Sequence, residues 1–332
     1  MREIYNNYKS FYGAYSKEEH GPDVAYEDKV MNYNERAVAN RDELFFFHKT
    51  ENAICKVDKE GKMSTIITFD EIKKAWEMDD IEETGWLIRL DYYDGYVYFT
   101  YYLQDAYFLS RINVENGNVD EPYTDSAFYC AIKDGYLYYE TPVDDDYEYF
   151  DVYRVKIESQ INIDKKELYL GKFIDQTYSR AKDFYAEIIY DDSYYLEAVY
   201  NEYGEKSIRK NGNRYLLCTD EKGKYTLKQC EKTDKKQESD ETQYTTISEH
   251  VLEYNSYGDK LFYLKQENGN TELIQTDLNG NNEKILKRYA DCYESVAYTD
   301  PTYIFSIMVC EDKLVVMYED QESNPKYDVV GY

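Results

Sequence analysis

The chain has 332 residues, of which 42% are hydrophobic and 42 are tyrosine, and its 67 acidic against 39 basic side chains give a net charge of −28 at pH 7. With only 15 Gly and 5 Pro, it is neither a collagen-like chain nor a disordered acidic tail, and it is long enough to bury a sizeable core. The negative charge repels phosphate backbones and anionic lipid, so we expect no nucleic-acid partner.

The opening residues 1–7 lack the apolar run of a secretory signal, and no stretch approaches the roughly 18–20 apolar residues that span a bilayer. We therefore expect no membrane insertion. A leader removed beforehand would leave no trace, so the sequence leaves export open.

A short motif recurs along the chain as a short turn that ends in Asp, then one variable residue, then a run of apolar and aromatic residues. The six copies have Asp at positions 42, 94, 134, 192, 259 and 312. In the second and third copies the next residue is Gly, and Asp-Gly favours the type I′ turn of a β-hairpin because both residues tolerate positive φ. An apolar run precedes each copy, so each predicts two antiparallel strands joined by a tight turn.

A second hairpin follows within most copies, as an alternating strand and a polar turn that closes on Gly. Its clearest examples are residues 54–61, 109–117, 217–223 and 274–280. Four short antiparallel strands that repeat every 40 residues or more are typical of a β-propeller, in which each unit is one blade. The competing architectures are a two-sheet sandwich and two separate β domains, and the sixfold recurrence disfavours both.

The sequence therefore predicts an all-β fold, a six-bladed β-propeller of four-stranded antiparallel blades. It forms a single domain over residues 24–332, after an N-terminal extension over residues 1–23. The predicted blades cover residues 34–68, 86–123, 127–172, 184–230, 250–288 and 303–332. The sixth has only three predicted strands, which would expose an unpaired edge, so we predict that residues 24–33 supply its fourth strand and close the ring.

The signature Asp-Gly-Tyr-[Val/Leu]-Tyr-[Phe/Tyr], followed by Leu-x-Arg-Ile-[Asn/Asp] and a glycine turn, is clearest over residues 94–117. It resembles the blades of six-bladed propellers in bacterial proteins of unknown function, which are likened to the lipoprotein-receptor type and more loosely to TolB-like propellers. The resemblance covers residues 32–332 and specifies a blade, with no catalytic residue to carry over. This chain lacks the Tyr-Trp-Thr-Asp sequence of the receptor type. Members of the bacterial group are often exported or surface-attached, which implies that location here, with a cytoplasmic one as the alternative.

Two segments between the strands have a distinct pattern. Residues 70–78 have apolar side chains near helical spacing, which predicts a short helix between the first two blades, with Trp76 as a cap of the joint or part of a lid. Residues 231–243 are charged and lack apolar side chains, which predicts a loop.

The candidate ligand face is the rim opposite the tight turns, because we expect the longer loops there and function concentrates in loops on a rigid scaffold. The predicted loops are residues 69–85, 101–107, 141–150 and 231–250. Aromatic rings offer a flat apolar surface and carboxylates accept hydrogen bonds or pair with basic groups. The candidate ligand-binding residues are Tyr101, Tyr102 and Asp105 of the second blade and Asp144, Asp145 and Tyr147 of the third. The alternative is that these tyrosines pack between blades.

The sequence predicts no metal site and no cofactor. Residues 144–151 mix carboxylates with aromatics but lack the ligand spacing of a calcium loop, and residues 277–283 occupy the position of a strand-joining turn. The six cysteines form no CxxC pair, so we expect buried free thiols, with disulfides or a metal site as alternatives.

Catalysis has little support in the sequence. It contains no G-x-S-x-G, H-E-x-x-H or phosphate-loop motif, and its histidines, His20, His48 and His250, lie in unrelated contexts. We therefore predict a non-enzymatic binding propeller that presents a Tyr-rich, acidic loop face to a protein, peptide or glycan. The alternative is a carbohydrate-active hydrolase or lyase with carboxylates at the channel mouth.

Overall fold

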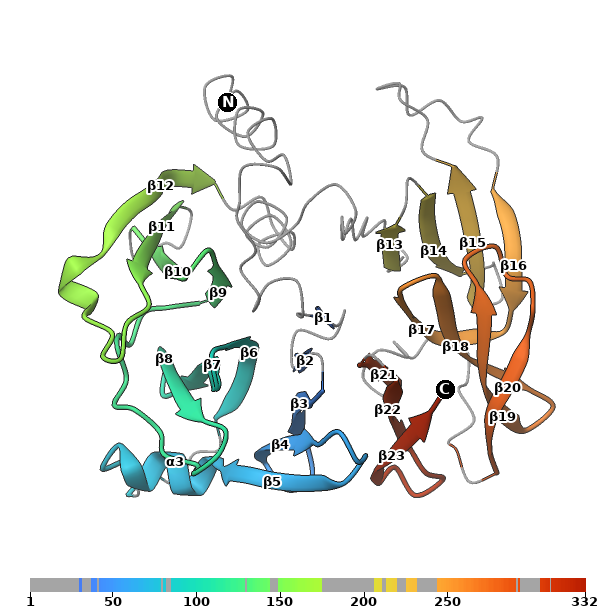
Figure 1. The fold of residues 1–332 in the computed structure, drawn as a ribbon, viewed down its shortest axis with the longest axis horizontal. Helices are drawn as coiled ribbons and strands as arrows, with labels where there is room; N and C mark the ends of the chain where they lie inside the picture. The colour runs from blue at the N-terminus through green and yellow to red at the C-terminus, as the bar shows by residue number, and fades with distance from the viewer. Residues whose placement is uncertain are drawn as a thin grey trace. The chain divides into compact units, whose positions relative to one another are not determined.

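The computed structural model describes residues 30–31, 37–40, 42–78, 80–81, 85–128, 130–143, 149–174, 206–210, 213–219, 225–231, 244–290, 292, 305–310 and 312–332. These residues form six antiparallel sheets of three to five strands, together with one α-helix and one 3-10 helix (Figure 1). The chain divides into two compact units, Met1–Asp191 and Asp192–Tyr332, and each unit contains three of the sheets. The all-β, antiparallel class predicted from the sequence is confirmed.

The first unit contains the first three sheets in chain order. The first sheet has the order β1 (Val30–Met31), β2 (Ala37–Ala39), β3 (Leu44–His48), β4 (Ala53–Val57) and β5 (Met63–Thr68). The second has β6 (Trp86–Tyr93), β7 (Tyr96–Leu103) and β8 (Ala106–Asn113). The third has β9 (Cys130–Lys133), β10 (Tyr136–Pro142), β11 (Tyr149–Lys156) and β12 (Glu167–Ile174), with the 3-10 helix η1 (Ile163–Lys165) before its last strand.

The second unit contains the other three sheets. The fourth sheet has β13 (Lys206–Lys210), β14 (Asn213–Thr219), β15 (Tyr225–Glu231) and β16 (Thr245–Glu249). The fifth has β17 (Val251–Tyr257), β18 (Lys260–Glu267), β19 (Asn270–Asp277) and β20 (Lys284–Tyr289). The sixth has β21 (Phe305–Val309), β22 (Lys313–Glu319) and β23 (Pro325–Gly331). The motif around position 192 lies outside the described residues.

The Asp-Gly hairpins are confirmed. Asp94 and Gly95 join β6 to β7 with φ values of 47° and 78°, and Asp134 and Gly135 join β9 to β10 with 51° and 70°. Positive φ at both central residues is the signature of a type I′ turn, whose twist matches that of the paired strands.

The turn between β17 and β18 ends in Asp259, as the repeat predicted. Tyr257 pairs with Lys260, so the two turn residues are Gly258 and Asp259, and Gly258 has a φ of 57°. The aspartate therefore occupies the second turn position here and the first position in the Asp-Gly copies. Glycine takes the left-handed position because it has no Cβ to clash.

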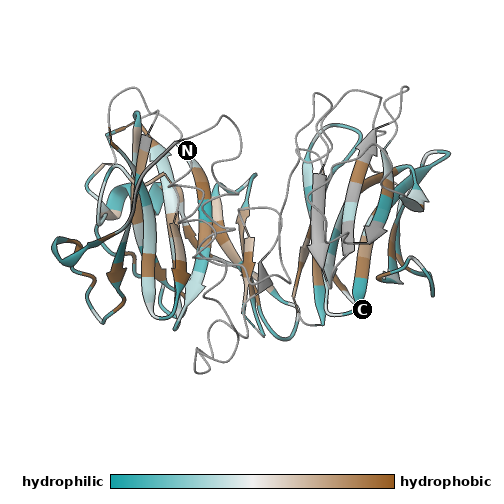
Figure 2. Ribbon diagram, turned by 90° about the horizontal axis from the view of Figure 1, so that it is seen from above, coloured by the Kyte–Doolittle hydropathy of each residue, from teal (hydrophilic) through white to brown (hydrophobic). Residues whose placement is uncertain are grey.

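Strands of different sheets lie side by side within each unit, since β6 contacts both β2 and β9 in the first unit, and β17 contacts β21 and β15 in the second. Buried polar side chains tie these strands together. The backbone N–H of Ile132 on β9 donates to the Asp91 carboxylate on β6 at 2.7 Å, and the Asn255 amide on β17 donates to the Ile307 carbonyl on β21 at 2.8 Å. Figure 2 shows apolar segments along the strands of both units and hydrophilic segments at the turns.

The predicted helix is confirmed as α3 (Phe69–Ala75). Thr68 and Glu71 form a capping box at its start, and Trp76 caps its end. The Trp76 ring stacks on Phe99 of β7 at 6.0 Å, and its Nε1 donates to the Asp120 carbonyl at 2.9 Å. The helix thus packs against the second sheet, and the role of Trp76 as a cap of the joint between the first two blades stays a prediction.

The strand predicted to close the ring is in a different place. Val30 and Met31 pair with Ala39 and Val38 and so extend the first sheet beyond β2. The prediction that residues 24–33 complete the sixth sheet is wrong for these two residues, and the others in that range lie outside the described part. An open strand edge can pair with a further strand, but the sequence does not identify which edge will do so. Here residues 30 and 31 pair with the edge of β2.

The predicted loop over residues 101–107 is also wrong. Tyr102 pairs with Tyr107 and Leu103 with Ala106, so β7 and β8 form a hairpin with only Gln104 and Asp105 in the turn. Both turn residues have positive φ, 50° and 59°, without a glycine to signal it.

The side chains of four cysteines are described, those of Cys55, Cys130, Cys292 and Cys310, and each is a buried thiol, as predicted. Burial raises the pKa of the Cys55 thiol to about 11, which keeps it protonated at neutral pH. In the part of the chain that the structure describes, no helix is long and apolar enough to cross a membrane.

Candidate functional site

The tight turns of a sheet share one rim with the end of its third strand. The backbone N–H of Val114, after β8, donates to the Gly95 carbonyl at 3.0 Å, and that of Ile157, after β11, donates to the Gly135 carbonyl at 2.8 Å. We call this edge the turn rim of the first unit.

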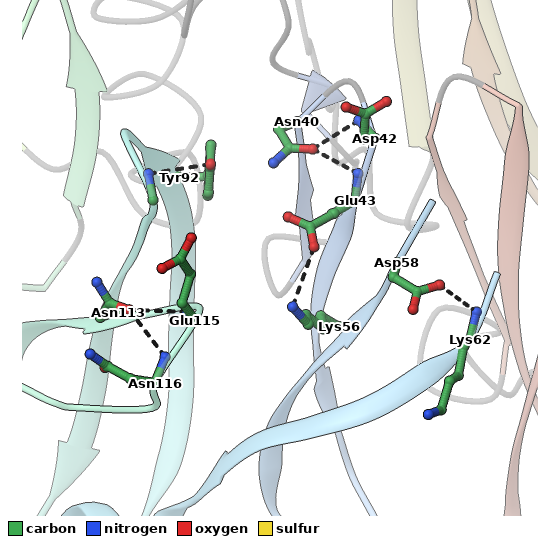
Figure 3. A network of polar contacts seen from close by, with 11 residues as sticks. Asn40, Asp42, Glu43, Lys56, Asp58, Lys62, Tyr92, Asn113, Glu115 and Asn116 are labelled. Atoms are coloured by element: carbon green, nitrogen blue, oxygen red, sulfur yellow. Dashed lines mark hydrogen bonds and ion pairs between the residues drawn. The ribbon is translucent and has the colours of Figure 1, made fainter. Parts of the chain in front are cut away.

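Polar side chains on the turn rim are engaged by the turns themselves (Figure 3). The Asp58 carboxylate accepts from the backbone N–H of Lys62 at 2.8 Å, and the Asn113 amide oxygen accepts from those of Glu115 and Asn116 at 3.0 and 3.2 Å. These side chains replace the hydrogen bonds that the turn backbone cannot make internally. They stabilise the turns and present no ligand site.

Asp277 plays the same part in the fifth sheet. Its carboxylate accepts from the backbone N–H groups of Asn279 and Asn281, both at 2.9 Å, and these bonds, that from Asn281 first, lower its pKa. The segment joins β19 to β20, so its assignment as a strand-joining turn is confirmed. Among the described residues, no group of three or more His, Cys, Asp or Glu side chains is placed to hold a metal ion.

The opposite rim of the first unit carries a row of aromatic rings, which we call the aromatic ladder: Trp86, Tyr102, Tyr107, Phe128 and Phe150. Successive ring centroids are 4.3, 4.9, 3.8 and 5.5 Å apart. The rings come from β6, β7, β8, the residues before β9, and β11, so the ladder crosses from the second sheet to the third. Contacts at these distances are favourable aromatic pairs.

The ladder runs from solvent into the core. Trp86 is 46% exposed, whereas Phe128 is 9% exposed and Phe150 is fully buried. Its inner end is fixed by packing, so its outer end presents the indole on a rigid support.

A carboxylate lies beside the outer end of the ladder. The Tyr102 hydroxyl donates to the exposed Asp105 carboxylate at 2.6 Å. The backbone N–H of Tyr107 donates to the carbonyl of Asp125 at 2.8 Å, so the backbone of a second exposed acidic residue lies next to the ladder at Tyr107. The outer end is therefore both aromatic and acidic.

The structure separates the residues predicted to bind a ligand. Tyr102 and Asp105 are in contact at the ladder, and their role as ligand contacts stays a prediction. Tyr101 is fully buried and stacks on Phe69 at 4.2 Å, so its ring is not accessible to a ligand. Asp144, Asp145 and Tyr147 lie outside the described residues.

Sequence reasoning missed Trp86, Tyr107 and Phe128. Tyr107 had a usable signal, because it stands two residues after the Gln104-Asp105 turn as Tyr102 stands two before it, and such positions face each other across a hairpin. Phe128 had no such signal, since its contact with Tyr107 depends on how two sheets pack.

A buried arginine joins several polar and aromatic side chains of the second sheet. Arg111 on β8 pairs with Asp120 at 2.8 Å, lies over the Tyr96 ring at 4.1 Å, and donates to the Tyr98 hydroxyl at 3.2 Å. Burial raises the pKa of Tyr98 to about 12, so the phenol stays neutral. The Asp-Gly-Tyr-x-Tyr signature and the arginine that follows it thus form one packed unit.

His48 holds a turn in the first sheet. Its Nδ1 accepts from the backbone N–H of Glu51 at 3.2 Å, and burial lowers its pKa. The side chain is 8% exposed, which makes it a core histidine of the β3–β4 turn.

No known family model and no curated protein matches this chain. Among solved structures, it is similar to a post-proline cleaving enzyme from Rickettsia typhi, with a TM-score of 0.42, 12% identity, and coverage of 99% of this chain and 54% of that one. It is also similar to the acylaminoacyl peptidase of Pyrococcus horikoshii, with a TM-score of 0.40, 12% identity, and coverage of 88% and 50%. For TolB from Acinetobacter baumannii the TM-score is 0.28, the identity 10%, and the coverage 75% and 50%. The chain spans about half the length of each of these proteins.

The comparisons overturn one prediction. Peptidases recur among the similar structures, including a prolyl endopeptidase and an isopeptidase, so the comparisons contradict a non-enzymatic binding protein and we withdraw that prediction. Since the TM-scores lie below 0.5, the likenesses assign no peptidase activity and no substrate to this chain. The TolB match fits the propeller resemblance drawn from the sequence.

Proposed function

We propose that this chain is a β-propeller hydrolase that itself cleaves peptides, and that the outer end of the aromatic ladder contacts the substrate. The reaction class is suggested by the names of the peptidases above and is what the experiment below tests. The observation within this chain that supports substrate contact is the exposed Trp86–Tyr102 stack with Asp105 beside it. The buried inner rings of the ladder hold this aromatic stack in place. The stack can therefore bind a flexible peptide without rearranging its own side chains.

The proposal also places the six sheets as six blades of one ring and one domain. It is supported by contacts between strands of successive sheets, from β2 to β6 to β9 in one unit and from β17 to β21 in the other. A closed ring of 332 residues should have a radius of gyration of about 20 Å. Small-angle X-ray scattering checks this, and a clearly larger, two-lobed particle would rule out the ring.

The activity is tested by incubating the full chain with an unfolded protein mixture and identifying new peptide termini by mass spectrometry. We expect cleavage by the unmodified chain and slower cleavage by Trp86→Ala, because the variant loses a substrate contact. Tyr244→Ala is the matched control, since Tyr244 is 44% exposed but belongs to the other unit. A folded chain that yields no new termini contradicts the proposal.

A further inference from the structure

We infer that the outer end of the aromatic ladder is a subsite for an arginine side chain of the peptide, with the guanidinium over the Trp86 indole and beside Asp105. The inference deepens the proposed function and rests on it for the peptide nature of the substrate. It adds to the proposed function that this rim prefers arginine among the residues of the peptide.

The chain uses the same chemistry twice within its own fold. Arg111 lies over the Tyr96 ring at 4.1 Å and pairs with Asp120 at 2.8 Å. Arg154 lies over the Tyr136 ring at 4.8 Å and pairs with a carboxylate of β12 at 3.0 Å. A planar guanidinium stacks on an aromatic face while its edge donates to a carboxylate, so the two contacts are compatible.

The outer end of the ladder presents an aromatic face and a carboxylate. No described basic side chain of this protein lies between them. Among the described side chains, no arginine or lysine lies over the Trp86 ring or pairs with Asp105. The indole is 46% exposed, and Tyr102 stacks on it at 4.3 Å and so supports it from one side. The exposed part of the indole is accessible to a cationic side chain of the peptide.

The charge of the surroundings favours a cation over a neutral group. The Tyr102 hydroxyl donates to one oxygen of Asp105, which fixes the carboxylate beside the ring stack. Asp125 adds a second exposed acid, and the chain as a whole has a net charge of −28. A cation is drawn to this rim by the field of the protein, whereas an anionic peptide is repelled.

Lysine fits the subsite less well than arginine. Its ammonium is a compact, strongly hydrated charge, whereas the guanidinium is planar, weakly hydrated and able to stack. We expect the order of affinity to be arginine, then lysine, then citrulline, which keeps the planar shape of arginine without its charge.

The experiment measures binding of three labelled peptides that differ only at one central residue, arginine, lysine or citrulline, by fluorescence anisotropy with the full chain. We expect the arginine peptide to bind about 10-fold more tightly than the citrulline peptide and to lose affinity as salt rises. Trp86→Ala and Asp105→Asn should each weaken the arginine peptide by about 2- to 5-fold and leave the citrulline peptide nearly unchanged. Tyr244→Ala, at an exposed site of the other unit, and Asp164→Asn, at an exposed site on the 3-10 helix η1, should change neither.

Equal affinity for the arginine and citrulline peptides overturns the subsite. So does an unchanged arginine preference in folded Trp86→Ala, or tighter binding of a neutral oligosaccharide than of any peptide. Because binding is read without cleavage, the two proposals fail separately. A lost arginine preference with cleavage intact removes the subsite alone, and an intact preference without cleavage removes the hydrolase alone.

Discussion

Replacing Arg111 with Ala is expected to lower the free energy of unfolding by about 3–5 kcal/mol, because the groups that pair with this buried guanidinium lose their partner. Arg111 is 3% exposed and pairs with Asp120 at 2.8 Å. The Tyr123 hydroxyl donates to the same Asp120 oxygen at 2.6 Å, so the carboxylate would keep one donor and lose its counter-charge.

The arginine also bonds to the segment that follows the third sheet's β11. Its guanidinium donates to the carbonyl of Ser159 at 2.6 Å and to that of Glu158 at 3.3 Å. A carbonyl that loses a charged donor in a buried place adds its own desolvation cost. The substitution is therefore expected to loosen the contact between the second and third sheets as well as the second sheet itself.

Urea unfolding followed by circular dichroism measures the loss, with Arg154→Ala as the matched control. Arg154 has the corresponding place on β11, stacks on Tyr136 and pairs with Glu167, but its side chain is 34% exposed. Exposed ion pairs contribute about 0–1 kcal/mol, so this variant should stay close to the unmodified protein. Equal losses in the two variants would show that burial of Arg111 contributes nothing.

The hairpins of the second and third sheets could be predicted from the sequence because the cause is local. Asp94-Gly95 and Asp134-Gly135 adopt positive φ, and both the residue types and their neighbours announce the turn. The Gln104-Asp105 turn adopts the same backbone without a glycine, so the sequence suggested a loop. Its positive φ values are imposed by the pairing of β7 with β8, which only the folded chain shows.

Only some residues of the candidate site could be predicted from the sequence. Tyr101 and Tyr102 are adjacent on one strand, and adjacent side chains point to opposite faces of a sheet, so both could not face the same ligand. The sequence does not say which of them faces the core of the first two sheets. Tyr101 stacks on Phe69, and Tyr102 is left for the ladder. Phe128 reaches the ladder from the third sheet, a contact between sheets that no local pattern encodes.

Replacing Gly85 with Ala is expected to lower the free energy of unfolding by about 1–3 kcal/mol and to disturb the ladder at the same time. A Cβ at Gly85 would stand 2.2 Å from the carbonyl oxygen of Tyr102 and 2.7 Å from the ring of Tyr101. The nearest atom belongs to the backbone of β7, so it cannot be moved as a flexible side chain can. The start of β6 must shift away from β7, and Trp86, the next residue, moves with it.

Gly331→Ala is the control for this substitution, because a Cβ there meets nothing closer than the Asp312 carbonyl oxygen at 3.9 Å. We expect the control to be neutral or slightly stabilising, since alanine loses less backbone entropy than glycine when a strand forms. Urea unfolding measures both variants, and the fluorescence of the half-exposed Trp86 reports the ladder. Because Trp86 stacks on Tyr102 at 4.3 Å, its displacement in Gly85→Ala should shift the emission and weaken the arginine peptide, while Gly331→Ala should leave both as they are. Equal stability and equal emission in the two variants would mean that the close approach of Gly85 to β7 constrains neither the sheet nor the ladder.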